Sequence, residues 1–131
     1  MPELRLKRLR FSREADNWLR TLKARTGITP NLLCRLAFCL SVSESGAPSA
    51  TLYPEDSDRE INRYTLLGEY DAVFVALLRQ RLMQDGSRNT ESMDDQFRAH
   101  VHRGILLLAA RLKSIADLEA LVRGPVAAGS R

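Results

Sequence analysis

One stretch of this 131-residue chain decides its fold: residues 4–42, which read LRLKRLRFSREADNWLRTLKARTGITPNLLCRLAFCLSV. Apolar and basic residues alternate over residues 4–11, with a shift of parity at Arg8, which predicts a short strand with one apolar and one basic face. Two short amphipathic helices are expected to follow this strand. The turn TGITP, residues 26–30, is expected to join them.

Local signals set the ends of these two helices. Ser12 is expected to cap the first helix, whose first turn is acidic, and Gly27 is expected to end it. Pro30 is a favourable first residue for the second helix. The buried stripe predicted for the first helix consists of Ala15, Trp18, Leu19 and Leu22. The apolar face predicted for the second consists of Leu32, Leu33, Leu36, Ala37 and Leu40, with Asn31, Arg35 and Phe38 on its other side.

The rest of the chain is predicted to be a loop and further helices. Residues 43–60 are rich in Pro, Ser and Gly and should form a loop, with Leu52 and Tyr53 held against the core. Helical patterns run from about Ile61 to residue 85 and from about Met93, and a last short helix should stop at residues 124–125, Gly-Pro. We therefore expect a mainly α single domain, residues 1–131, with a short basic strand and four to five helices. Its parts are a ribbon-helix-helix-like head (1–42), a loop (43–60), a helical core and oligomerisation part (61–123) and a tail (124–131).

The charge of the chain is uneven. Residues 1–40 hold nine basic and three acidic residues, about +6, whereas the remaining residues hold eleven basic and thirteen acidic ones, about −2. A localised positive field is typical of proteins that bind polyanions, and the shortage of aromatic residues favours duplex DNA over single strands. The residues predicted to contact DNA are Arg5, Lys7, Arg8, Arg10, Arg13, Arg20, Lys23, Arg25, Asn31 and Arg35.

Two interpretations of the basic strand stay open. It could enter the major groove as a ribbon paired between two chains, as in ribbon-helix-helix transcriptional regulators. Alternatively, it is an edge strand that its charges keep soluble. The sequence leaves open whether the strand pairs within one chain or between two.

The sequence predicts no catalytic residues, no metal site and no cofactor. His100 and His102 lie two apart and so point in different directions on a helix, with one of them expected to face solvent. Cys34 and Cys39 lack CxxC spacing and are expected to be reduced, in a cytoplasmic protein without a membrane segment. Two alternatives to a DNA-binding accessory protein stay open: a metal-dependent DNA-nicking enzyme that uses Asp94, Asp95 and His100, and a ribbon-helix-helix-type transcriptional regulator.

Three segments resemble the DndE family, small proteins of the bacterial DNA phosphorothioation system. They are RLRFSREADNWLRTLKARTGITPNLLCRLAFCLSV (8–42), LLGEYDAVFVALLRQR (66–81) and FRAHVHRGI (97–105). The resemblance implies a helical homo-oligomer, tetramers among the forms, that binds DNA and favours nicked duplex. It also implies that a sulfurtransferase and an ATPase, with which the chain works, replace a phosphate oxygen of DNA by sulfur. Lysines credited with DNA contact in the family correspond mostly to arginines here, such as Arg20 and Arg25 beside Lys23.

Overall fold

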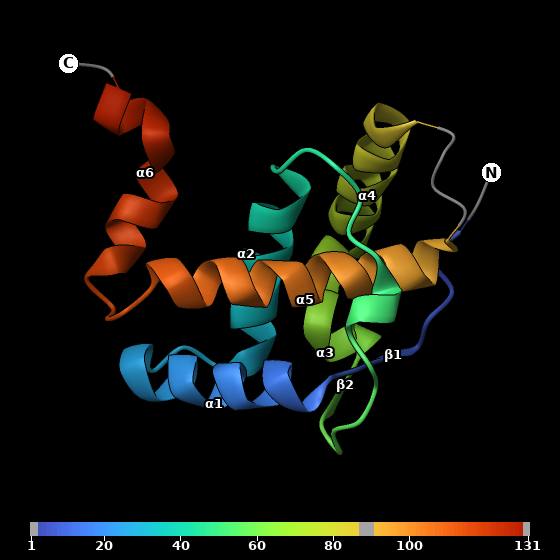
Figure 1. Ribbon diagram of the computed structural model, residues 1–131, viewed down its shortest axis with the longest axis horizontal. Helices are drawn as coiled ribbons and strands as arrows, with labels where there is room; N and C mark the ends of the chain where they lie inside the picture. The colour runs from blue at the N-terminus through green and yellow to red at the C-terminus, as the bar shows by residue number, and fades with distance from the viewer. Residues whose placement is uncertain (1–2, 87–90, 130–131) are drawn as a thin grey trace.

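The computed structural model describes residues 3–86 and 91–129, and it is mainly helical (Figure 1). In chain order its elements are β1 (Arg8–Arg10), α1 (Arg13–Thr26), α2 (Pro30–Val42), η1 (Ala50–Leu52), β2 (Glu60–Asn62), α3 (Arg63–Leu67), η2 (Gly68–Tyr70), α4 (Asp71–Asp85), α5 (Met93–Arg111) and α6 (Asp117–Gly129). The expected mainly α, single-domain fold with a short basic strand near its N-terminus is confirmed. Among the described residues, no helix has the length and apolar character needed to cross a bilayer.

Helix α5 is the centre of the fold, and α2 crosses it at very short range (Figure 1). Gly104 of α5 lies against the backbone of Ala37 of α2, where no Cβ would fit. Around this crossing the core is built from apolar side chains of both helices, including Leu33, Phe38, Phe97, Val101 and Ile105. The two helices therefore fix the framework that positions β1 and α1.

The predicted signals at the start and end of α1 are confirmed. The Ser12 hydroxyl accepts a hydrogen bond from the N–H of Ala15, and Gly27, at φ 77°, ends the helix, with its N–H donating to the Lys23 carbonyl.

The predicted face of α2 is partly wrong. Phe38 is buried in the core, whereas Leu32 is exposed. Because α2 is covered by other elements on more than one side and carries apolar residues on all of its sides, spacing alone does not select its buried face.

Strand β1 pairs with β2 of the same chain, which answers the question that the sequence left open. The pairing is antiparallel and places Arg8 opposite Asn62 and Arg10 opposite Glu60. Leu9 is buried and its two neighbours are exposed, as the alternation predicted. The strand is shorter than predicted, because the N–H groups of Arg5 and Leu6 bond instead to the Asp94 carboxylate.

The helical segment expected from Ile61 is wrong at its start and is divided. Ile61 belongs to β2, and the Asn62 side chain caps α3. Gly68, at φ 56°, then ends α3 and is the first residue of η2, since this backbone conformation interrupts a regular helix.

Two further expectations outside the head are wrong. Helix α6 runs on to Gly129 and so passes residues 124–125, where the sequence indicated a stop. Leu52 is exposed, although Tyr53 is buried as expected.

Candidate nucleic-acid interface

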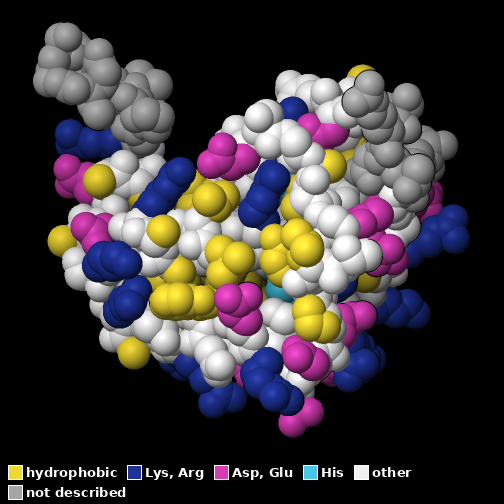
Figure 2. All heavy atoms as spheres, in the orientation of Figure 1, with side chains coloured by type: hydrophobic (Ala, Val, Ile, Leu, Met, Phe, Trp, Pro, Cys, Tyr) yellow, Lys and Arg dark blue, Asp and Glu magenta, His cyan; other side chains and the backbone are white. Residues whose placement is uncertain are grey.

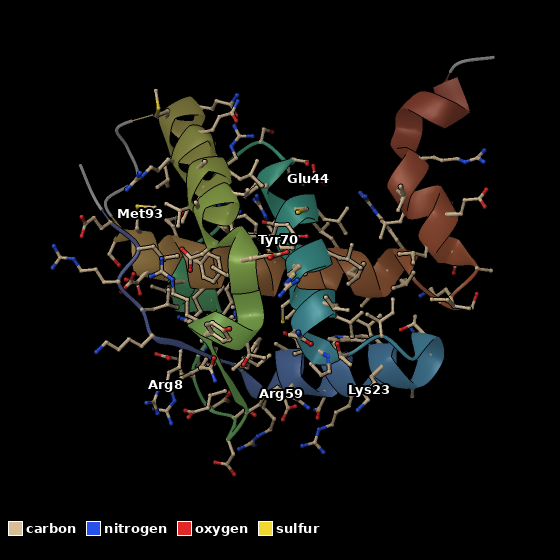
Figure 3. All side chains as sticks on the ribbon, turned by 180° about the vertical axis from the view of Figure 1, so that it is seen from behind. Arg8, Lys23, Glu44, Arg59, Tyr70 and Met93 are labelled. Atoms are coloured by element: carbon tan, nitrogen blue, oxygen red, sulfur yellow. The ribbon has the colours of Figure 1, made fainter. Side chains whose placement is uncertain are left out.

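Seven of the ten residues predicted to contact DNA are exposed, and they lie on the N-terminal segment, β1 and α1. These seven are Arg5, Lys7, Arg8, Arg10, Arg13, Arg20 and Lys23. Figure 3 shows Arg8 and Lys23 along one edge of the molecule, with Arg59 between them. We call these seven exposed residues together the basic edge.

The basic edge is interrupted by a segment that the sequence assigned to a loop. Residues 55–60, which read EDSDRE and which we call the acidic strap, run beside β1 and the start of α1. Glu60 forms ion pairs with Arg8 and Arg10, and the Asp56 carboxylate accepts the N–H of Arg13. Figure 2 accordingly shows basic and acidic side chains interleaved along the lower edge of the face that it draws.

Asp16 anchors the strap to α1. Its carboxylate accepts hydrogen bonds from the Arg59 Nε (2.5 Å), the Ser57 hydroxyl (2.8 Å) and the Arg20 Nε (3.2 Å). Burial raises the pKa of Asp16, but these hydrogen bonds together outweigh burial and hold the pKa below its ordinary value of 3.8. The sequence predicted Asp16 only as a favourable charge at a helix start, because two of these three partners, Ser57 and Arg59, lie more than forty positions away.

A hollow of about 600 Å³ opens beside this anchor. Its walls are Arg13, Asp16, Arg20, Asp56, Ser57, Asp58, Arg59 and Glu60. Acidic and basic groups alternate around it, so it offers no uniform anion site. Lys7 and Lys23 are exposed, do not line this hollow, and take part in none of the ion pairs found among the described residues.

We predict that Asp16→Asn lowers the free energy of unfolding by about 3 kcal/mol, because it leaves the Arg59 guanidinium, only a quarter exposed, without its counter-charge. Urea unfolding at neutral pH measures this loss. Asp58→Asn is the matched control, since Asp58 is an exposed carboxylate in the wall of the same hollow and should change stability by less than about 0.5 kcal/mol. Equal effects of the two substitutions would contradict the anchoring role.

The other three predicted contact residues are engaged within the chain. The Arg35 Nε donates to the Leu66 carbonyl at 2.6 Å, and its guanidinium lies 5.9 Å from the centre of the Tyr70 ring. Asn31 donates to the Thr65 carbonyl, and Arg25 lies over the Trp18 ring. The contacts of Arg35 and Asn31 join α2 to α3, and the contact of Arg25 with Trp18 lies within α1, so these three residues are not counted in the basic edge.

Of the residues in the nicking alternative, Asp94 and His100 make separate contacts within the fold, and Asp95 is exposed. Asp94 accepts the N–H groups of Arg5 and Leu6, and the Asp95 N–H bonds to the Ser92 hydroxyl at the start of α5. His100 is fully buried, with its Nδ1 2.8 Å from the Ser41 hydroxyl. In the part of the chain that the structure describes, no group of three His, Cys, Asp or Glu residues could hold a metal ion.

The expectation that one histidine faces solvent is wrong, because both are buried in the core. The His102 Nε2 accepts the N–H of Ser12 at 3.1 Å, and its Nδ1 lies 2.8 Å from the Arg98 carbonyl. Burial lowers the pKa of each histidine to about 4. Both imidazoles are thus neutral parts of the framework.

Cys34 is also part of the core. Burial raises the pKa of its thiol to about 12. A thiol with such a pKa stays protonated at neutral pH and is a poor nucleophile, which disfavours a role as a sulfur carrier.

Comparison with known proteins agrees with this architecture. The family model described as DNA sulphur modification protein DndE matches residues 8–116. The crystal structure of DndE from Escherichia coli B7A, described as involved in DNA phosphorothioation modification, is 30% identical, with a TM-score of 0.63 over 82% of this chain and 98% of that chain. A mutant DndE, described as involved in DNA phosphorothioation, is 28% identical, with a TM-score of 0.58 over 79% of this chain and 97% of that one.

No curated protein matches the chain. The family match spans well over half of the sequence, and the chain belongs to the DndE family.

Proposed function

We propose that this protein is a DNA-binding subunit of a DNA phosphorothioation system and is not itself the enzyme. The observation that carries the proposal is the basic edge, seven exposed cationic side chains on adjoining elements of one small domain. Membership of the DndE family supports the link to phosphorothioation. Its proposed partners are duplex DNA, including nicked duplex, further copies of the chain, and the sulfurtransferase and ATPase that carry out the chemistry.

Phosphate neutralisation would supply the affinity. Lys7 and Lys23 are exposed and take part in none of the ion pairs described above, so they are the most available cations of the edge. The guanidinium of Arg5 makes a long contact of 3.8 Å with the Glu3 carboxylate. Contacts between cationic side chains and DNA phosphates carry little sequence information, so the protein would bind many sequences with similar affinity.

The proposal predicts steep salt dependence, with the logarithm of the binding constant falling by about 0.9 per neutralised phosphate for each tenfold rise in salt. The double variant Lys7→Gln, Lys23→Gln should flatten this slope by about 1.8 and weaken binding. Fluorescence anisotropy of a labelled duplex across a salt series measures both quantities. Intact, nicked and single-stranded oligonucleotides of the same sequence then test the preference for nicked duplex.

The control is the double variant Lys113→Gln, Arg123→Gln, which removes the same charge from exposed positions between α5 and α6 and on α6. It should leave the slope nearly unchanged, because these residues do not belong to the N-terminal segment, β1 or α1, which carry the basic edge. Binding that does not depend on salt, absence of binding, or equal losses in the two double variants would each refute the proposal.

A further inference from the structure

We infer that Glu60 competes with DNA phosphates for Arg8 and Arg10 and thereby limits the affinity of the basic edge for DNA. The inference rests on the proposed function and names a residue that regulates it. It assigns a role to Glu60, the residue of the acidic strap that forms ion pairs with two arginines of the basic edge.

The geometry of the small sheet places one carboxylate between two guanidinium groups. Glu60 is the register partner of Arg10, and Arg8 lies on the same exposed face two residues away. The Glu60 Oε1 lies 3.2 Å from the Arg8 Nη1, and its Oε2 lies 3.7 Å from the Arg10 Nε. Each oxygen of one carboxylate thus engages a different arginine.

The three side chains remain open to solvent. The exposed fractions are 62% for Arg8, 56% for Arg10 and 40% for Glu60. Ion pairs at such exposed positions are weak, so a phosphate can displace Glu60 from both arginines. Because phosphate and carboxylate have the same sign, they cannot occupy the position between the two arginines together.

The backbone around Glu60 is fixed, so that the carboxylate stays close even when it is displaced. The Phe11 N–H donates to the Arg59 carbonyl at 3.3 Å, and the Arg63 N–H donates to the Lys7 carbonyl at 2.8 Å. On the inner side, Arg59 is held by Asp16. Only the Glu60 side chain can turn away, and its charge then still repels a phosphate on the sheet.

The test compares Glu60→Gln with Glu55→Gln in the salt series described above. Glu55 is an exposed carboxylate at the other end of the same strap, and its replacement changes the net charge equally. We expect Glu60→Gln to tighten DNA binding about fivefold at low salt, the scale of an exposed ion pair, and to steepen the salt slope. Glu55→Gln should tighten it much less.

A double-mutant cycle separates competition from a general charge effect. In the background Arg8→Gln, Arg10→Gln, the substitution Glu60→Gln should have no more effect than Glu55→Gln, because the contested arginines are gone. If wild-type protein binds DNA but the two acidic residues behave alike in both backgrounds, the competition is refuted and the proposed function stands. If neither wild type nor Glu60→Gln binds DNA, the proposed function is wrong and the inference falls with it.

Discussion

Gly104→Ala is expected to lower the free energy of unfolding by at least about 3 kcal/mol, the upper range for forcing one extra methyl group into a packed core. A Cβ at this position would lie 1.8 Å from the Ala37 carbonyl oxygen and 2.2 Å from its carbonyl carbon. Both are backbone atoms, so no change of rotamer relieves the clash. Helix α2 would have to move away from α5, and the buried side chains on both helices would lose their contacts.

Urea unfolding followed by circular dichroism measures the loss. On an exposed helical position the same substitution would stabilise the protein by about 1 kcal/mol, because alanine favours the helix more than glycine does. The control is Ala110→Ser, which adds one atom to the exposed side of α5 and should change stability by less than about 0.5 kcal/mol. A Gly104→Ala variant as stable as the wild type would mean that α2 and α5 do not cross as closely as described.

The second large effect is expected on acidification, since the fold should lose most of its stability between pH 6.5 and pH 4. Burial holds the pKa of His100 and of His102 at about 4 in the folded protein, against an ordinary value of 6.5. In that interval the unfolded chain binds protons that the folded chain does not, so falling pH favours unfolding. Above pH 6.5 this destabilisation is absent.

Each histidine contributes a loss of about 3 kcal/mol when the pH falls through this whole interval. Together they approach the total stability of a small domain. The free energy of unfolding, measured in urea at a series of pH values, should fall by about 2.7 kcal/mol per pH unit in the middle of the interval.

His102→Gln separates the two histidines, because glutamine can still accept the N–H of Ser12 but does not titrate. Whatever this variant does to stability at neutral pH, its free energy of unfolding should change by only about 1.4 kcal/mol per pH unit in the middle of this interval. Unchanged stability of the wild type between pH 7 and pH 4.5 would contradict the neutral, buried state of both imidazoles.

Features set by neighbouring residues were predictable from the sequence. Ser12, Gly27 and Pro30 act within one helical turn, so the bounds of α1 and the start of α2 followed from them. The alternation around Leu9 gave the exposed and buried faces of β1 correctly. The family resemblance, based on contiguous segments, is confirmed by the family match.

Features that depend on distant partners were not predictable in this way. The partner of β1 lies about fifty residues further along, inside a region that polar composition indicated to be a loop and the start of a helix. Arg35 looks like a surface cation in the sequence, yet its donors satisfy carbonyl groups at the end of α3. Short-range periodicity carries no information about the partner of a strand or of a side chain. Only the folded backbone brings the carbonyl groups of α3 close to Arg35.

The arginines that bond to carbonyl groups change what the net charge of +4 means for a binding partner. Arg98 donates to the carbonyls of Tyr53 and Ala50, and Arg103 donates to those of Ser41 and Gly46. These guanidinium groups serve as cross-links that tie the end of α2 and the segment after it to α5, a task for which the single ammonium of lysine lacks the geometry. An electrophoretic measurement would include their charge in full. An approaching polyanion, in contrast, contacts mainly the exposed cations of the basic edge.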